Sequence, residues 1–371
     1  MAPKQHEQPI YLTRRDLRVN QFQGCPFQAC FHTTQNTKAM SPSFNNQTKA
    51  SELVPVYAPH IAGRTILITG VSPGSIGDSF VKQVAVARPA KFILAGRSPS
   101  KFQPLIDGLG ITHPEIKVKP LTLDLTSLAS VRKAAETVTS WPDVPHIDIL
   151  VNNAGIMASA YSLTEDGFES QFQTNHLGHF LFTNLIMFKI LASPSPPRIV
   201  NVSSNAHRLG HVRWTDYNFN EGKHYDKWMA YGQSKTANSL FSIALAERLG
   251  PSKGVMAFSL CPGYVPTNLA AHEAHDFPGF LEALRKADVV VGSKYMWGMG
   301  DIEPKDMDQG AATHVFAAFD PELKDKNGEF LTDCRVADPW KEEVYPWARS
   351  KVDAEMLWAL SEKLVGQEFR Y

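Results

Sequence analysis

The sequence has few cysteines, no excess of charge of either sign and no long apolar run. Four cysteines, Cys25, Cys30, Cys261 and Cys334, are too few and too scattered for a disulfide framework, and no second Cys pair or nearby His cluster completes a zinc site. We interpret them as reduced thiols and expect no metal. Because the first twenty residues contain no apolar run of the kind that a secretory signal needs, we expect a cytoplasmic protein.

The charge balance excludes further classes of partner. Lys+Arg and Asp+Glu both total 37, so no basic excess favours nucleic acid or anionic lipid. The longest apolar stretch, 177–188, is shorter than a membrane span and contains Thr183 and Asn184. Hydrophobic residues make up 43% and charged residues 20%, which permits a sizeable core and excludes disorder, collagen and coiled coil as the class of the whole chain.

The chain of 371 residues is long enough for one large α/β domain with extensions or for two domains. Residues 1–48 are rich in Gln, Asn, Thr and Pro and show no strand or helix period, so we expect a disordered N-terminal extension. One domain should follow over 49–371, with an aromatic-rich insert at about 268–306 that covers the substrate.

Short apolar runs alternate with helical patterns from residue 64 onward. The runs are RTILIT (64–69), KFILAG (91–96), KVKPLTL (117–123), HIDILVNN (146–153), RIVNVSS (198–204) and VMAFSLCPG (255–263). This alternation predicts a doubly wound, Rossmann-type α/β fold whose parallel sheet is covered by helices on both faces. The active crevice should lie at the carboxyl ends of the strands.

Three later segments extend this pattern. A helical pattern returns over 308–319, and 329–331 has the character of a last strand. The amphipathic segment 344–369 either packs on the core or forms a subunit contact, and in the second case the protein is a homo-oligomer.

A glycine-rich turn follows the first run and leads into a helix. Gly70, Gly74 and Gly77, with Ser75 and Ile76 between them, would let the backbone approach a pyrophosphate at the helix N-terminus. No Gly-Lys-Ser/Thr follows, which excludes a P-loop. The turn indicates a dinucleotide site.

Arg97 decides between the two nicotinamide dinucleotides. It closes the second run, where NAD enzymes usually place a carboxylate, and its guanidinium can pair with a 2′-phosphate, so we expect NADP(H). Asp124 either accepts a hydrogen bond from the adenine amino group or caps the helix that begins near Ser127. Asn153 either braces the adenosine ribose or ties neighbouring strands together.

Tyr231 and Lys235 lie four residues apart in a helical pattern over 229–249. Positions i and i+4 share one helical face, so the phenol and the ammonium should point into the same pocket. A nearby cation favours the phenolate and would lower the Tyr pKa from about 10 toward the working range of an acid-base catalyst.

Taken together, these motifs resemble the short-chain dehydrogenases/reductases, and within them the retinol-dehydrogenase-like branch and its fungal relatives. The resemblance covers about residues 48–369. It rests on the glycine turn and on AGR (95–97), NNAG (152–155), NHLGHF (175–180), RIVNVSS (198–204), YGQSK (231–235) and PGYVPT (262–267).

The resemblance implies a set of catalytic roles. Tyr231 is the proton donor during reduction and the base during oxidation, and Lys235 lowers the Tyr pKa and binds the nicotinamide ribose. Ser204, rather than its neighbour Ser203, donates to the carbonyl oxygen. Asn175 positions a water that relays protons through Lys235, unless it is a helix-packing amide.

The resemblance also bears on cofactor contacts and metals. Thr267 and the backbone near Val265 hold the nicotinamide carboxamide. His176, His179 and His207 are interpreted as structural or solvated rather than as metal ligands, because the chemistry needs no metal and no carboxylate completes a set.

The turn departs from the family pattern by one extra residue. Either Gly74 is the pyrophosphate glycine with an insertion after it, or Ser75 replaces that glycine and its side chain faces away.

The sequence therefore predicts an NADPH-dependent oxidoreductase acting on a ketone, aldehyde or alcohol of an apolar small molecule, with secondary metabolism as the family-level analogy. The alternative is a regulatory protein that binds the dinucleotide without turnover.

Overall fold

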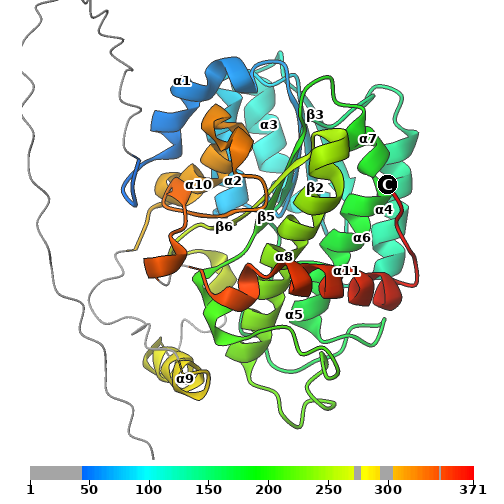
Figure 1. Cartoon of the computed structure of the whole chain (residues 1–371). Helices are drawn as coiled ribbons and strands as arrows, with labels where there is room; N and C mark the ends of the chain where they lie inside the picture. The colour runs from blue at the N-terminus through cyan, green and yellow to red at the C-terminus, as the bar shows by residue number, and fades with distance from the viewer. Residues whose placement is uncertain (1–43, 271–276, 293–303, 342–343) are drawn as a thin grey trace, which may run out of the picture. The chain divides into compact units, whose positions relative to one another are not determined.

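An eight-stranded sheet forms the centre of the protein, with the strand order β3-β2-β1-β4-β5-β6-β7-β8 (Figure 1). The structure, a computed structural model, describes residues 44–270, 277–292, 304–341 and 344–371. Strands β1 to β7 pair in parallel and β8 is antiparallel to β7. The strands are β1 Thr65–Thr69, β2 Lys91–Gly96, β3 Lys117–Thr122, β4 Ile149–Asn152, β5 Arg198–Val202, β6 Met256–Cys261, β7 Phe330–Thr332 and β8 Arg335–Val336.

Helices connect the strands. The α-helices are α1 Ala50–Ile61, α2 Ile76–Ala85, α3 Gln103–Thr112, α4 Leu128–Ser140, α5 Ser170–Phe172, α6 Gly178–Leu185, α7 Met187–Leu191, α8 Lys227–Lys253, α9 Phe277–Val290, α10 Met307–Phe319 and α11 Lys351–Val365. A π-helical turn, η2 Gln173–Leu177, joins α5 to α6. Short 3-10 helices are η1 Pro99–Phe102, η3 Asn205–Leu209, η5 Pro321–Asp325, η6 Pro339–Lys341 and η7 Pro346–Ala348.

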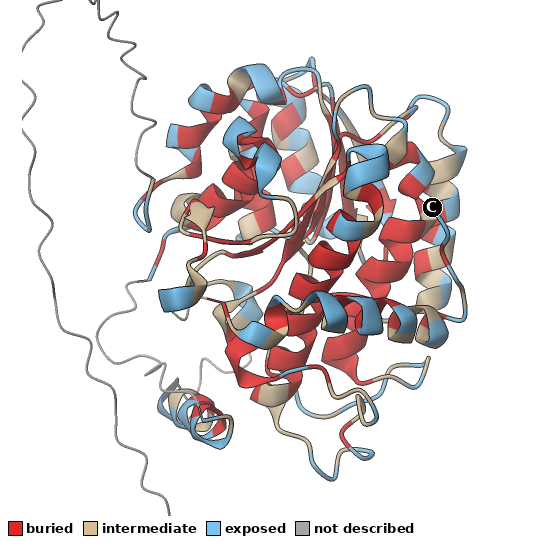
Figure 2. Cartoon of the chain, in the orientation of Figure 1, coloured by how far each residue is buried: buried red, intermediate tan, exposed pale blue. Residues whose placement is uncertain are grey.

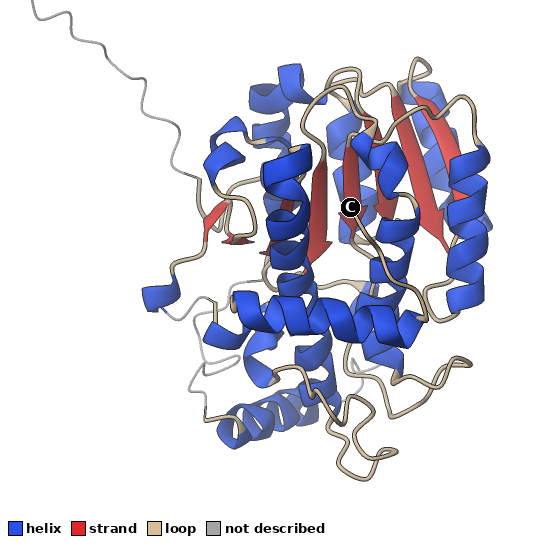
Figure 3. Ribbon diagram, turned by 45° about the vertical axis from the view of Figure 1, so that its right-hand side comes forward, coloured by secondary structure: helices blue, strands red, loops and turns tan. Residues whose placement is uncertain are grey.

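The two faces of the sheet belong to two separate apolar clusters. Alternate residues of a strand point to opposite faces, so Leu67 packs with α4, α6, α8 and α11, whereas Ile66 and Ile68 pack with α1, α2, α3 and α10. The central strands are buried on both sides, and Figures 2 and 3 show the sheet enclosed between the helices. This double burial explains why the strands read as continuous apolar runs.

The structure confirms the expected doubly wound α/β fold. The expected helix at 308–319 is α10, and the expected last strand at 329–331 is β7. Helix α11 buries Leu357 and Trp358 in the core, which is the first of the two alternatives for the C-terminal segment.

The expected boundaries of the domain involve residues outside the described ranges. Residues 44–371 form one compact unit. The expected extension, 1–48, lies outside the described residues except for 44–48, and the expected insert, 268–306, is described over 268–270, 277–292 and 304–306.

Helix α1 was not predicted from the sequence. It contains Pro55 and Pro59, which conceal its helical pattern, and it is held by packing against α10 and α2. The hydroxyl of Tyr57 donates a hydrogen bond to the carboxylate of Asp320, which follows α10, and both residues are buried. This bond fixes α1 to the end of α10.

Replacing Tyr57 with Phe tests that anchor. Tyr57→Phe should lower the free energy of unfolding by about 1–3 kcal/mol, because a buried hydrogen bond to a charged group is lost. Urea unfolding followed by tryptophan fluorescence measures the change. Tyr264→Phe is the control, since the side chain of Tyr264 is 41% exposed. Equal stability of the two variants would contradict the anchoring role of Tyr57.

Candidate active site

The residues singled out from the sequence gather at one edge of the sheet. The glycine turn follows β1, Arg97 follows β2, Asp124 follows β3, Asn153 follows β4 and Ser204 follows β5. Because these strands are parallel, their carboxyl ends lie at the same edge. The loop that carries Val265 and Thr267 follows β6 at this edge as well.

The glycine turn brings backbone segments together more closely than side chains would allow. Gly70 has φ +76°, and a Cβ there would lie 2.7 Å from Cα of Ala154. A Cβ on Gly77 would lie 2.4 Å from the Gly70 carbonyl oxygen. Gly74 has φ +71°. The turn therefore exposes backbone at the N-terminus of α2, an arrangement that suits a pyrophosphate.

Ser75 faces into the turn. Its Oγ donates to the Gly70 carbonyl at 3.3 Å and accepts from the Asp78 amide at 3.2 Å, so it is the N-cap of α2. The Ser75 side chain thus bonds within the turn itself, a geometry that both alignments considered for the lengthened turn allow. Ile76 begins α2 and packs beside Gly310 of α10.

Asp124 and Asn153 make contacts within the protein. The Asp124 carboxylate accepts from the amide and hydroxyl of Thr126 at 3.0 and 2.7 Å, while Ser127 caps α4. The Asn153 amide donates to the carbonyls of Thr69 and Gly70 at 2.8 and 2.9 Å. Asn153 thus ties the end of β4 to the glycine turn. Arg97 is exposed at the end of β2.

Tyr231, Lys235 and Ser204 are brought together where α8 packs against η3. Tyr231 and Lys235 are one turn apart near the start of α8 and are 5% and 4% exposed. The Lys235 ammonium lies 5.5 Å from the Tyr231 ring centroid and donates to the Val202 carbonyl at 2.9 Å. Ser204 hydrogen bonds to Tyr231, whereas the hydroxyl of Ser203 donates to the Lys235 carbonyl at 2.7 Å. Ser204, not Ser203, therefore faces the phenol.

Burial dominates the protonation of this cluster. It raises the pKa of Tyr231 above its usual value, and the hydrogen bond from Ser204 offsets part of this effect. Burial also lowers the pKa of Lys235 to about 8. The direction for Tyr231 is opposite to the one expected from the spacing of the pair, because the loss of solvent on burial is the largest influence on the phenol.

Asn175 lies in the π-helical turn η2, an irregularity that recurs at functional sites. Its side-chain amide accepts from the Ile156 amide and donates to the Ile156 carbonyl and to Ser234 Oγ, each at 2.9 Å. A Cβ on Gly155 would lie 3.0 Å from Asn175 Oδ1 and 3.5 Å from Lys235 Nζ. Asn175 therefore lies beside Lys235, but its side chain is used in packing.

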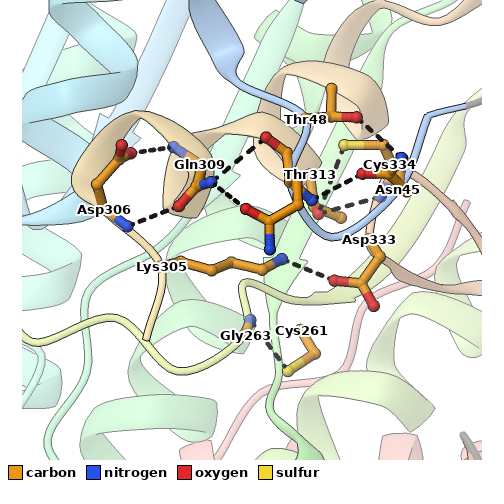
Figure 4. A network of polar contacts seen from close by, with 11 residues as sticks. Asn45, Thr48, Cys261, Gly263, Lys305, Asp306, Gln309, Thr313, Asp333 and Cys334 are labelled. Atoms are coloured by element: carbon orange, nitrogen blue, oxygen red, sulfur yellow. Dashed lines mark hydrogen bonds and ion pairs between the residues drawn. The ribbon is translucent and has the colours of Figure 1, made fainter. Parts of the chain in front are cut away.

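The loop after β6 is held by a lysine that sequence reasoning missed (Figure 4). Lys305 packs against Gly263, its amide donates to the Tyr264 carbonyl at 2.8 Å, and its ammonium pairs with Asp333 at 2.7 Å. Val265 contacts Gly310. Because Lys305 and Asp333 are far from the loop in sequence, no local pattern could have identified them.

Thr267 has a local role in the same loop. Its Oγ1 accepts from the Leu269 amide at 3.2 Å, and its carbonyl accepts from the Ala270 amide at 3.3 Å. This arrangement keeps the loop turned where the cofactor carboxamide was expected.

His176, His179 and His207 are buried in the core, and each ring has its own hydrogen-bond partners. His176 contacts Ser361 of α11, and His207 bonds to the Ser204 carbonyl and the Tyr345 amide. His179 lies between Thr69 and Asn175. All three are buried, so none is solvated. Over the described ranges, no cluster of His, Cys, Asp and Glu is suited to a metal ion.

The structure also bears on the cysteines and on membrane insertion. Cys261 and Cys334 are buried free thiols, and Cys25 and Cys30 lie outside the described residues. No helix in the described part of the chain has both the length and the apolar character of a membrane span.

Comparisons with known proteins agree on one family. A sequence profile described as short chain dehydrogenase matches residues 64–219. The chain is 35% identical to human retinol dehydrogenase 11 over 306 residues, which is 82% of this chain and 87% of that protein. It is 36% identical to human retinol dehydrogenase 13 over 311 residues, with 83% and 86% covered.

A solved structure supports the same relationship. The crystal structure of a protein from Mycobacterium paratuberculosis, described as putative and uncharacterized, superimposes with a TM-score of 0.62 at 31% sequence identity. The match covers 84% of this chain and 96% of that one.

Removing the Lys305 anchor tests the role of the loop after β6. Lys305→Met should raise the Kd of a nicotinamide dinucleotide about 3- to 10-fold, which corresponds to at most about 1.4 kcal/mol, because Asp333 loses its partner and the loop its support. Quenching of intrinsic fluorescence measures the Kd. Lys341→Met removes an exposed lysine that pairs with Asp338 and is the control. An unchanged Kd for Lys305→Met would contradict the anchoring role.

Proposed function

Because the chain belongs to the short-chain dehydrogenase/reductase family, we propose that it is an NADP(H)-dependent enzyme that interconverts an apolar ketone or aldehyde and its alcohol. The chain is an oxidoreductase of the retinol-dehydrogenase-like branch. The observation that carries the proposal is the grouping of the buried Tyr231 and Lys235 with the half-buried Ser204 at the sheet edge that also carries the glycine turn. A cytoplasmic location and a role in secondary metabolism belong to the same proposal and rest on composition and family analogy.

The residues at the sheet edge fit a nicotinamide dinucleotide. Gly70 and Gly77 leave the backbone at the start of α2 without side chains, so the N-terminus of α2 would hold a pyrophosphate. Arg97 stands exposed after β2, where a cation favours a 2′-phosphate over a free hydroxyl. This position supports NADP(H) over NAD(H).

Tyr231 and Ser204 act on the substrate oxygen. The bound nicotinamide supplies the hydride in reduction and accepts it in oxidation. The raised pKa keeps the Tyr231 phenol protonated at neutral pH, so it can donate a proton to a carbonyl oxygen. The Ser204 hydroxyl donates a second hydrogen bond to the same oxygen as negative charge develops. A protonated phenol favours reduction as the working direction.

Lys235 supports the phenol from one helical turn away. Its ammonium has three donors, of which one is directed to the Val202 carbonyl, so others remain for ribose hydroxyls. With a pKa of about 8, it holds its charge at neutral pH and loses it as the pH rises through that value. A charged Lys235 stabilises the phenolate that is left after proton transfer.

The surroundings of Tyr231 favour an apolar substrate. Trp228, Leu209 and Ala158 form a buried apolar cluster with Tyr231, and α9 adds Phe280, whose ring lies 4.7 Å from that of Trp228. Phe280 is one of the aromatic residues of the insert. The sequence also suggests Phe277, Tyr295, Met296 and Trp297 as insert residues that could line a pocket; the side chain of Phe277 and all of the other three lie outside the described residues.

Replacing Tyr231 with Phe separates the enzyme from a non-catalytic dinucleotide-binding protein. Tyr231→Phe should lower kcat by about 10²- to 10⁴-fold, the usual contribution of a general acid, and leave the NADPH Kd within about twofold. NADPH absorbance with a panel of apolar carbonyl compounds measures turnover. Tyr161→Phe removes a buried hydroxyl with no hydrogen-bond partner among the described residues and is the control. Unchanged turnover in Tyr231→Phe would eliminate the mechanism, and NADPH binding without turnover in the wild type would favour the regulatory alternative.

Replacing Arg97 with Ala tests the choice of cofactor. The NADPH Kd should rise about 10- to 100-fold, because a charge-assisted hydrogen bond contributes about 1.5–3 kcal/mol, and the NADH Kd should stay unchanged. Fluorescence titration with both dinucleotides measures the preference. Arg88→Ala removes an exposed arginine before the amino end of β2 and is the control. If Arg97→Ala keeps its NADPH preference, Arg97 does not bind the 2′-phosphate.

A further inference from the structure

The imidazole of His179 connects the start of the glycine turn with Asn175. His179 lies in α6, is 1% exposed and is enclosed by the core. Its Nε2 lies 2.9 Å from Thr69 Oγ1, at the end of β1, and its Nδ1 lies 3.0 Å from the Asn175 carbonyl oxygen. Both ring nitrogens are therefore used, one toward each part of the site.

One placement of the protons gives both ring nitrogens of His179, the Thr69 hydroxyl and the Asn175 carbonyl a hydrogen-bond partner. A carbonyl only accepts, so the ring proton must be on Nδ1, and Nε2 must accept from the Thr69 hydroxyl. Thr69 Oγ1 in turn accepts from the amides of Asn153 and Ala154 at 3.0 and 2.9 Å, which leaves its own proton for the ring. Burial lowers the pKa of His179 to about 4, and Lys235 adds to this effect, so the ring is neutral at pH 7.

The Asn175 end of the connection lies where the helix is irregular. Because η2 is a π turn, its backbone departs from regular α-helical spacing. The Asn175 side chain hydrogen bonds to Ile156 and Ser234. The backbone carbonyl of Asn175 hydrogen bonds to the His179 ring. The main chain and the side chain of Asn175 are thus each held by hydrogen bonds, near Lys235.

We propose that His179 is a positioning residue for hydride transfer, which fixes the Asn175 main chain relative to the glycine turn through one neutral imidazole. His179 contacts neither substrate nor cofactor in this assignment and acts through Asn175 and Thr69. The proposal goes beyond the proposed function in giving a role to this ring, and its kinetic test rests on that function.

Three substitutions of His179 separate the two contacts. Asn places its amide near the position of Nδ1 and can still donate to the Asn175 carbonyl, Gln reaches only the Nε2 position, and Leu makes neither contact. We expect His179→Leu to lower kcat by about 10- to 100-fold, in the range of a lost positioning contact, with the NADPH Kd within about threefold. His179→Asn should recover most of this loss and His179→Gln little of it.

The deuterium isotope effect shows whether the loss is one of position. If hydride transfer is slowed, NADPH deuterated at the transferred position should give an isotope effect at least as large in His179→Leu as in the wild type, with one NADPH bound per chain. A structural defect would instead lower kcat and the NADPH stoichiometry together. His176→Leu is the control, because His176 is equally buried but contacts Ser361. It should lower the melting temperature without lowering kcat per bound NADPH.

Several results would overturn the proposal. They are a kcat of His179→Leu within twofold of the wild type, an equal loss in the Asn and Leu variants, recovery by Gln but not by Asn, and a loss accounted for by reduced NADPH stoichiometry.

A measurement that does not depend on turnover distinguishes this proposal from the proposed function. The ¹⁵N spectrum of the imidazoles at pH 7, assigned by comparison with His179→Asn, should show a neutral His179 protonated on Nδ1. Protonation on Nε2 would overturn the proposal. If the wild type shows this tautomer but reduces no carbonyl compound, the proposed function fails while the hydrogen-bond assignment stands.

Discussion

The candidate active site depends on the close approach of α8 and η3. A Cβ on Gly232 would lie 2.7 Å from the Ala206 carbonyl, and one on Gly210 would lie 2.6 Å from the Met229 carbonyl. Neither position tolerates a side chain at this distance, because close-packed backbone cannot move aside cheaply. Ser204 and Tyr231 flank this contact and meet across it. The glycine in YGQSK is thus as much a part of the site as the phenol and the ammonium.

The same packing sets the protonation states of the site. A buried phenol keeps its proton, and a buried ammonium gives its proton up more readily, so burial moves the pKa values of the two groups apart. A bound cofactor and substrate would displace more solvent, and the Ser204 hydroxyl and the Lys235 charge would then be the main source of stabilisation for negative charge.

The sequence predicts the elements that depend on local pattern and misses those that depend on distant contacts. Apolar runs identified β1 to β6. Burial on both faces leaves a continuous apolar run in the inner strands, whereas the edge strand β3 is exposed or half-buried at all but one residue and its run is mixed. Helix α1 was missed since Pro55 and Pro59 interrupt its pattern and its stability comes from α10. Lys305 was missed since Asp333 is 28 residues away.

The direction of the Tyr231 pKa could not be read from spacing at all. The spacing of Tyr231 and Lys235 shows only that a cation lies near the phenol. The exposure of the phenol depends on the packing of α8 against η3 and α9. The same limit applies to Asn153, for which the sequence left two roles open. Its bonds to the Thr69 and Gly70 carbonyls follow from the neighbouring positions of β1 and β4, which only the sheet order reveals.

The glycine turn is held by side chains of the protein itself, and Ser75 also hydrogen bonds to the Gly70 carbonyl. Because three side chains, those of Thr69, Ser75 and Asn153, hydrogen bond around this turn within the protein itself, its shape is set before a dinucleotide binds, and binding need not bear the entropic cost of ordering it.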